Sequence, residues 1–320
     1  MLPLRNAFFF TAGIAFLALA KAKHLLKGYT SPKPFDVSES QRCIEYDWQV
    51  IDEWLKYLTK YTNDENALLN KRVLELGPGS DLGAGLMLLA KGCTQYDACD
   101  VNALVKAVPD EFYTELFDWL SQKDGQKNGQ TDIAFLQQQL EQWQSGQPSQ
   151  LNYVVRDDFD LVAAFGEGTV DIVFSQAAFE HFDDVEMTVA QMSRVCKPEA
   201  TLVIEIDLKT HSRWITPKDP NNIYRYPQFV YDAFYFRGIP NRMRPYQYVG
   251  VLEQYGWQNV ELTPISRIEE ERGDRRSRYA GMNRQFLDQK NQMDYLSIVI
   301  CAQRRSVYQS KDDVAIDSTI

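Results

Sequence analysis

Residues 73–83 read VLELGPGSDLG, and this stretch decides the fold. The apolar run over 71–76 predicts a buried strand, Gly77-Pro78-Gly79 predicts a tight turn, and Leu82–Lys91 is predicted as a helix that ends at Gly92. A strand, a glycine-rich turn and a helix in this order let the backbone approach a ligand at the open edge of a doubly wound sheet. A Gly-x-Gly turn alone is a weak signal, so the surrounding sequence has to support it.

Two carboxylates accompany this turn. Glu75 lies near the end of the predicted strand, where a buried acid requires a partner such as the cationic amine of a ligand. Asp100 ends a second predicted strand, Thr94–Asp100, and follows Gly79 by 21 residues, close to the ~20-residue offset of a ribose-binding acid. The alternatives are that Glu75 caps the next helix and that Asp100 forms a turn.

Strands and helices alternate along the rest of the chain. Further strands are predicted at 152–156, 170–175, 201–207, 259–262 and 295–302, with helices at 183–195 and 245–255. We therefore expect an α/β fold with a doubly wound, mostly parallel seven-stranded sheet and right-handed crossovers.

The predicted organisation has one main domain with appendages. Ser38-Glu39-Ser40-Gln41 is predicted to cap a helix that precedes the first strand. The predicted segments are an apolar N-terminal helix (1–30), a helical extension (31–70), the main domain (71–304) with a helical insertion (104–150) and a substrate cap (208–245), and a flexible tail (305–320).

The ordered set of motifs resembles the class I, Rossmann-like, S-adenosylmethionine-dependent methyltransferases. Glu75-Leu76-Gly77-Pro78-Gly79 matches the first five positions of their acid-x-Gly-x-Gly-x-Gly motif, whereas Asp81 replaces the third glycine. The segment 170–175 with Phe179-Glu180-His181 resembles their fourth motif. The resemblance implies S-adenosylmethionine as cofactor, with its amino-acid end at Glu75 and the glycine turn and its ribose at Asp100. The implied cofactor-binding residues are Glu75, Gly77, Pro78, Gly79, Asp100, Val101, Asp157, Asp158, Ser175 and Gln176.

The sequence also limits the acceptor. The net charge of −10 argues against a nucleic-acid partner, which normally binds a basic face. The fourth motif also lacks the Asn-Pro-Pro-Tyr or Asp-Pro-Pro-Tyr pattern of base-amine methylation. We expect methylation, mainly of oxygen, on a small-molecule, glycan or lipid-linked acceptor. The alternatives are a non-catalytic binding or scaffold protein and an NAD-dependent dehydrogenase, against which the acid at Glu75 argues.

Acceptor chemistry is expected near the strand ends and the cap. His211 follows the fifth predicted strand and His181 the fourth, so both are candidate general bases. Arg242, Arg244 and Tyr235 are candidate acceptor-binding residues; alternatively the arginines pair with nearby acids and the aromatic residue packs the cap. Some relatives bind a divalent metal through Glu-x-x-Glu-His. Because Ala177 replaces the first of these acids, no metal is expected.

The N-terminal stretch 7–20, AFFFTAGIAFLALA, leaves three alternatives open. As a helix it would span roughly 21 Å, less than the ~30 Å hydrocarbon core of a bilayer. It either packs on the protein's own surface, or anchors the protein at a membrane interface, or is a secretory leader ending at Ala18-Leu19-Ala20. A cytosolic cofactor argues against the leader, and the five scattered cysteines fit a reducing compartment. We therefore expect a cytoplasmic protein, with membrane contact on the cytoplasmic side left open; the oligomeric state is not predicted.

Overall fold

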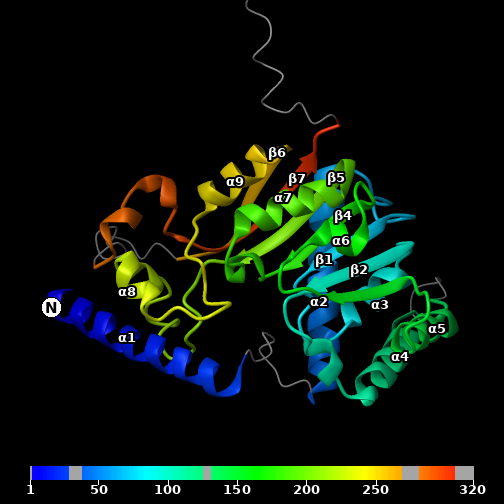
Figure 1. The fold of residues 1–320 in the computed structure, drawn as a ribbon, viewed down its shortest axis with the longest axis horizontal. Helices are drawn as coiled ribbons and strands as arrows, with labels where there is room; N and C mark the ends of the chain where they lie inside the picture. Colours follow the sequence, from blue (N-terminus) through cyan, green and yellow to red (C-terminus); the bar gives the residue numbers. More distant parts are fainter. Residues whose placement is uncertain (1, 29–37, 125–130, 269–280, 307–320) are drawn as a thin grey trace, which may run out of the picture.

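A computed structural model describes residues 2–28, 38–124, 131–268 and 281–306. Its centre is a seven-stranded sheet with the strand order β3-β2-β1-β4-β5-β7-β6 (Figure 1). Neighbours among β1 to β5 pair in parallel, and β7 runs antiparallel to both β5 and β6. This confirms the expected doubly wound, mostly parallel sheet. The strands are β1 (Arg72–Leu76), β2 (Gln95–Asp100), β3 (Leu151–Val155), β4 (Val170–Gln176), β5 (Cys196–Asp207), β6 (Trp257–Arg267) and β7 (Tyr295–Arg304).

The predicted bounds of β5 and β6 are too short. β5 begins at Cys196 rather than 201, although Glu199 has a φ of +66° and the pairing with β4 is irregular between Val170 and Ile172. β6 continues to Arg267 instead of ending at 262. As the edge strand of the sheet, β6 has polar residues along its half-buried face, so no apolar run marks its full length.

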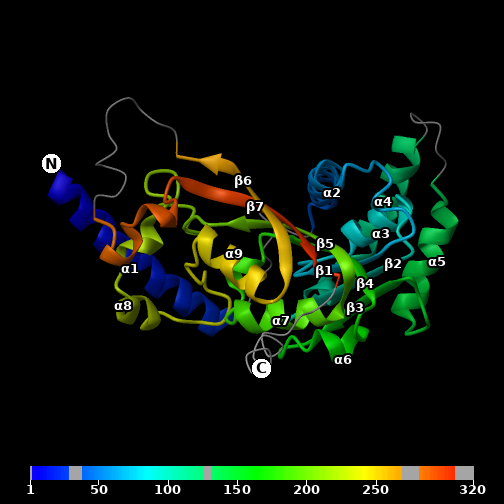
Figure 2. The ribbon, with the colours of Figure 1, turned by 90° about the horizontal axis from the view of Figure 1, so that it is seen from above.

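Helices cover both faces of the sheet (Figure 2). On one face, Trp54 stacks on Phe174 of β4 with ring centroids 4.7 Å apart. Burying such a side chain contributes about 1.5–3 kcal/mol, so this contact fixes the first helix of the extension on the sheet. The helices on this face are α2 (Ser40–Thr62), α3 (Gly83–Ala90), α4 (Asp110–Asp124) and α5 (Ile133–Gln144); those on the other are α6 (Leu161–Phe165), α7 (Val185–Val195) and α9 (Pro245–Gln254).

The start of α2 differs from the one that the sequence predicts. The helix begins at Ser40, so that Glu39 is the N-cap residue and makes no side-chain cap hydrogen bond. Its carboxylate accepts a hydrogen bond from Arg42 at 2.5 Å, and the two side chains form an exposed ion pair.

A smaller apolar cluster lies beside the sheet and forms the cap. It contains η3 (Asn222–Arg225), α8 (Gln228–Asp232) and part of 281–294, and α1 (Leu2–Lys27) runs along it (Figure 1). Asn222 Nδ2 donates to the Phe9 carbonyl at 2.9 Å, across the helix face that carries Gly13. A Cβ atom at Gly13 would lie 1.9 Å from the Tyr226 hydroxyl, so only glycine allows this close approach. α1 is therefore docked on the cap, and it is longer than the stretch 7–20.

Some predicted segments lie partly outside the described residues. Residues 29–37 of the N-terminal segments, 125–130 of the insertion and 307–320 of the tail are not described.

Candidate functional site

The glycine turn at the end of β1 has the conformation that the sequence predicts. Gly77 and Gly79 have φ angles of +75° and +82°, which favour glycine. A Cβ at Gly77 would lie 2.6 Å from the Cβ of Ala178, so this turn also has no room for a side chain. Pro78 and both glycines line a cavity at the carboxyl edge of the sheet. The turn thus exposes backbone to a ligand.

Asp81, which replaces the family's third glycine, has a local structural role. Its carboxylate accepts the backbone N–H of Gly83 at 3.0 Å, at the start of α3. A Cβ at Gly83 would lie 2.5 Å from Oδ2 of Asp47, so α2 packs closely against the start of α3.

Glu75 is buried at the end of β1, with 3% of its surface exposed, and still lines the cavity. Its Oε2 accepts a hydrogen bond from the Tyr96 hydroxyl at 2.5 Å. The hydrogen bond comes from β2, which orients the carboxylate and leaves it facing the cavity beside Gly79.

Asp100 ends β2 and lines a second cavity that adjoins the first. Its Oδ1 accepts the backbone N–H of Asn102 at 2.8 Å, and its side chain is almost fully buried. Burial raises the pKa of this carboxyl to about 6, against the opposing effect of the backbone N–H groups of Asn102, Gly79 and Val101. A carboxylate in this place accepts hydrogen bonds well once it is charged.

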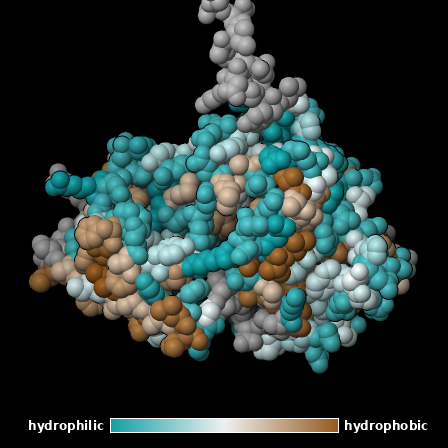
Figure 3. Space-filling model, in the orientation of Figure 1, coloured by the Kyte–Doolittle hydropathy of each residue, from teal (hydrophilic) through white to brown (hydrophobic). Residues whose placement is uncertain are grey.

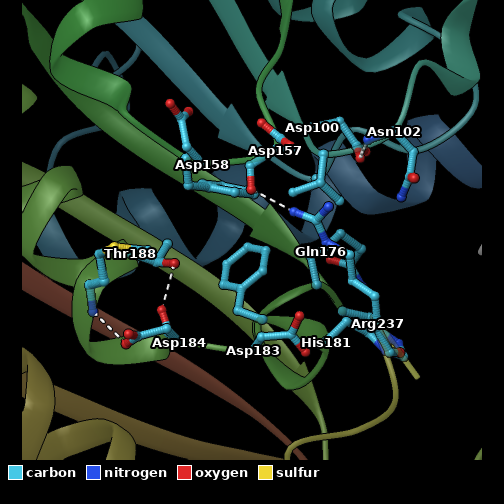
Figure 4. A pocket seen from close by; sticks show the side chains of 18 of the residues that line it. Asp100, Asn102, Asp157, Asp158, Gln176, His181, Asp183, Asp184, Thr188 and Arg237 are labelled. Carbon is cyan, nitrogen blue, oxygen red and sulfur yellow. Dashed lines mark hydrogen bonds between the residues drawn. The ribbon is translucent and has the colours of Figure 1, made fainter. Parts of the chain in front are cut away.

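The two cavities have volumes of about 360 and 740 Å³, and we name them the β2 cavity and the cap cavity. The β2 cavity is lined by Asp100, Val101, Asp157, Asp158 and Gln176 (Figure 4), and the cap cavity by Glu75, the glycine turn and His211. Gly77, Gln176, Ala177, His181 and Gly238 line both. They therefore form one continuous cleft along the carboxyl ends of the strands, where ligands bind in open α/β sheets.

The two acids after β3 differ in their partners. Arg156 donates two hydrogen bonds of 2.8 Å to the carboxylate of Asp158, and this lowers the pKa of Asp158 to about 2. The guanidinium of Arg237 reaches from the cap to the carbonyl oxygen of Asp157 (Figure 4). Both acids line the β2 cavity, and the carboxylate of Asp158 is paired with Arg156.

The structure separates two residues that the sequence groups together. Gln176 lines both cavities. Ser175 is fully buried, and its hydroxyl donates to the Leu76 carbonyl at 2.8 Å between β4 and β1. Its side chain therefore lies behind the cleft and joins two strands, unlike the cofactor contact that was expected.

The two candidate bases meet in the cap cavity. The ring centroids of His181 and His211 are 4.8 Å apart. Nδ1 of His181 lies 2.6 Å from the Gly238 carbonyl oxygen, which can only accept, so this nitrogen carries the proton and Nε2 has the free lone pair. Burial lowers the pKa of both imidazoles to about 4, and the nearby charge of Lys209 adds to the effect on His211. Both rings are therefore neutral near pH 7.

The predicted acceptor-binding residues lie elsewhere. Arg244 is fully buried and donates to the carbonyls of Asn291, Gln292 and Tyr295 at 2.7–3.1 Å. Arg242 is buried too and donates to the carbonyls of Ile223 and Tyr226.

Neither guanidinium lines the β2 or the cap cavity; both join segments of the cap through backbone carbonyls. Tyr235 is half exposed outside both cavities, whereas the next two residues, Phe236 and Arg237, line them. The acceptor-binding assignments are therefore corrected to structural roles for the arginines and a surface position for Tyr235.

Sequence reasoning missed three contributors to the cleft. α2 supplies Tyr46 and Asp47, and the end of α1 supplies His24, so both N-terminal helices line the cap cavity. Ala177 has a φ of +47° at the end of β4, a conformation uncommon outside glycine. The contribution of the helices depends on tertiary docking and has no signal in the sequence; the strain at Ala177 has none either.

A family model described as a methyltransferase domain matches residues 130–204, from before α5 to the middle of β5. No curated protein matches the chain. The match covers less than half of the chain, and the seven-stranded sheet with its antiparallel β7 is consistent with a Rossmann-like methyltransferase fold.

Solved structures with similar chains include three of different activity. The CurJ carbon methyltransferase is 16% identical with a TM-score of 0.39, and the match covers 74% of this chain and 49% of that one. Phosphoethanolamine N-methyltransferase 2 of Haemonchus contortus with S-adenosyl-L-methionine is 13% identical with a TM-score of 0.41, and the match covers 77% of this chain and 52% of that one. The [4+2]-cyclase SpnF is 12% identical with a TM-score of 0.41, and the match covers 80% of this chain and 81% of that one. This chain thus spans about half the length of the first two. All three TM-scores are below 0.5, so the strand order and the family match define the likeness.

Proposed function

Because the chain carries a methyltransferase domain on the class I fold, we propose that it transfers the methyl group of S-adenosylmethionine to an oxygen of a small-molecule or lipid-linked glycan acceptor. The observation that supports this most is the continuous cleft from Asp100 to His211. It offers a carboxylate for the ribose, a second carboxylate with a glycine turn for the amino-acid end, and two neutral imidazoles beyond them.

In the proposed reaction, the hydroxyl oxygen of the acceptor loses its proton and attacks the methyl carbon. The carbon–sulfur bond breaks and its electron pair stays on sulfur, which leaves S-adenosylhomocysteine. Because such a displacement needs alignment more than bond chemistry from the protein, the enzyme's contribution is to hold both reactants in line and to activate the hydroxyl. His181 and His211 line the cap cavity and are the residues that we propose for this activation.

Calorimetry with S-adenosylhomocysteine, S-adenosylmethionine and NAD tests the proposal directly. We expect both adenosyl compounds to bind and NAD not to bind. Binding of none of them would favour the non-catalytic alternative, and binding of NAD alone would favour the dehydrogenase. With an acceptor in hand, unchanged turnover across pH in both His211→Ala and His181→Ala would refute the activating role.

We further propose that the protein contacts the cytoplasmic face of a membrane through α1. The side of this helix that faces away from the cap is an exposed stripe at three- to four-residue spacing. Its large members are Leu4, Phe8, Leu19, Leu25 and Leu26, each at least 63% exposed. Figure 3 shows hydrophobic residues gathered along the edge of the molecule where α1 runs in Figure 1. A stripe of this size on a water-exposed helix fits the interface of a bilayer.

The position of α1 favours an interfacial rather than a spanning helix. By length and hydropathy, Leu4–Lys27 could cross a membrane. Crossing would require it to leave the cap, where Gly13 is fitted against Asn222 and Tyr226. Lys23 and His24, at the end of the helix, line the cap cavity. The cleft therefore opens beside the proposed membrane contact, which suits an acceptor carried by a lipid.

Flotation with anionic lipid vesicles tests the membrane contact. We expect the protein to float with the vesicles, and the combined variant Leu4→Gln, Phe8→Gln, Leu25→Gln to stay in the dense fraction. Leu69→Gln with Ile265→Gln is the control, because these apolar residues are also exposed, at 45% and 42%, and lie away from α1. If the wild type stays in the dense fraction, or if both variants float equally, the proposed membrane contact is wrong. If the wild type instead forms concentration-dependent dimers that the α1 variant does not form, the stripe binds a second copy of the chain.

A further inference from the structure

We propose that Glu180, His181 and His211 form a binding site for a divalent transition-metal cation. One ligand atom from each residue lies within 4.8 Å of those of the other two. Glu180 and His181 follow β4 in η2 (Phe179–His181), whereas His211 follows β5 on the cap segment. The site therefore bridges two neighbouring strand ends inside the cap cavity, which Glu180 also lines.

The burial of Glu180 is the first argument for a cation. The residue is 3% exposed, and no described side chain donates a hydrogen bond to either carboxylate oxygen. Buried polar groups normally have partners, and a carboxylate aimed into a cavity without a side-chain donor lacks one. A cation in the cavity would supply it.

The orientation of His181 is the second argument. Its Nδ1–H donates to the Gly238 carbonyl, which fixes the ring and leaves the Nε2 lone pair for a ligand. Metal-binding histidines are typically held in this way, with the outer nitrogen bonded to a carbonyl or carboxylate.

The surrounding charges are compatible with a cation. Asp207 lies with Oδ2 3.7 Å from Nε2 of His211 and 3.4 Å from Nζ of Lys209. With Glu180 ionised, two carboxylates and one ammonium leave the site with a net negative charge. Asp207 therefore partly offsets the lysine.

The donor set indicates the kind of metal. Two imidazoles and one carboxylate suit zinc, iron or cobalt, whereas magnesium and calcium prefer oxygen ligands. Ligand atoms around zinc lie closer together than 4.8 Å, so binding has to draw them inward. His211 is the most exposed of the three and lies on the cap, so its side chain is the one with room to move. This inference replaces the expectation of no metal, which rested on Ala177 alone.

A cation at this site would activate the methyl acceptor bound in the cleft. This role rests on the proposed function, whereas the binding of the metal itself does not. Three protein ligands leave a coordination position open, and Ala177 adds no ligand to fill it. An acceptor hydroxyl bound there would have a lowered pKa and lose its proton more readily. The two histidines would then hold the metal, and the released proton would pass to the carboxylate of Asp207, which lines the same cavity.

Metal titration of the chelator-treated full chain tests the site without any cofactor. We expect one equivalent of Zn²⁺ by calorimetry, a visible absorption band with Co²⁺ typical of nitrogen ligation, and much weaker binding of Mg²⁺. His211→Ala and Glu180→Gln should each weaken Zn²⁺ binding by at least about 100-fold, since lost outer-sphere partners alone cost 10–100-fold. His24→Ala is the matched control, because it removes a histidine of the same cavity that lies outside the cluster and should bind Zn²⁺ like the wild type.

Two results would overturn the inference. One is the absence of stoichiometric Zn²⁺ or Co²⁺ binding by the wild type, and the other is unchanged binding in His211→Ala. If Glu180→Gln fails to fold by circular dichroism, His211→Ala decides alone, because its side chain is partly exposed. Zn²⁺ binding without binding of S-adenosylhomocysteine would support the metal site and refute the proposed function. Binding of S-adenosylhomocysteine without Zn²⁺ binding would support the proposed function and refute the metal site.

Discussion

The pKa of Asp100 makes cofactor binding measurably pH-dependent. Burial raises this pKa to about 6, so the carboxyl becomes protonated as the pH falls from 7 to 5, where an ordinary aspartate is still charged. The proposed ribose contact requires the charged form, which accepts hydrogen bonds. The affinity for S-adenosylhomocysteine should therefore be full above pH 7 and decline as the pH falls through 6.

The size of the effect follows from that pKa. If only the charged form binds, the Kd rises about 2-fold at pH 6 and about 11-fold at pH 5 relative to pH 8, or about 1.4 kcal/mol at the lower pH. Asp100→Asn removes the charged acceptor at every pH. A hydrogen bond to a charged group contributes about 1.5–3 kcal/mol, so this variant should bind roughly 10- to 150-fold more weakly at pH 8 and show no pH slope.

Calorimetric titrations from pH 5 to pH 8 measure both effects. Asp158→Asn is the control, because its ion pair with Arg156 lowers the pKa of Asp158 to about 2, outside this range. His181 and His211 have pKa values of about 4 and stay neutral over most of the range. A wild-type Kd that is constant from pH 5 to pH 8 would refute the reasoning, as would an Asp100→Asn variant that keeps the wild-type slope.

Three further predictions concern the turn, the N-terminal helix and the cap. Glu75→Gln should weaken S-adenosylhomocysteine binding by about 10-fold or more. Tyr96→Phe should weaken it less, because the Tyr96 hydroxyl only orients the Glu75 carboxylate. Equal affinity of Glu75→Gln and wild type by calorimetry would exclude the contact between Glu75 and the amine. Gly13→Ala places a Cβ against Tyr226 and should lower the free energy of unfolding, measured in urea, by about 1–3 kcal/mol. Proteolysis of α1 should also become faster. An unchanged midpoint of urea unfolding would mean that α1 is not docked on the cap. Arg244→Met should lower the free energy of unfolding by at least about 1–3 kcal/mol, because buried carbonyls lose their donor, and leave cofactor binding intact. Normal stability with lost turnover would restore an acceptor-binding role.

The sequence predicts most of the sheet and the glycine turn because their signals are local. Buried strands appear as apolar runs, and positive φ angles at Gly77 and Gly79 select glycine directly. The position of Asp100 at the end of β2 follows from the same pattern. The predictable part of the site therefore consists of the residues at the end of a single strand and in the turn that follows it.

The cap could not be predicted in this way. Arg242 and Arg244 look like binding residues in the sequence, yet both are buried because α8 and the segment 281–294 close over them. Glu180 and His211 are distant in the sequence and meet only because β4 and β5 are neighbours in the sheet. Burial and contact here depend on which segments pack together, and no periodicity along one segment encodes this.

The placement of β7 has a consequence for how the chain is made. The strand is the last of the seven in the sequence, yet it lies between β5 and β6 and pairs with both. During synthesis β6 therefore emerges before its described sheet partner exists, and β5 presents an open edge until residues 295–304 have left the ribosome. Open strand edges pair readily with other chains, so a transcript cut before β7 should yield an aggregating product even though the glycine turn and the cleft residues are all present.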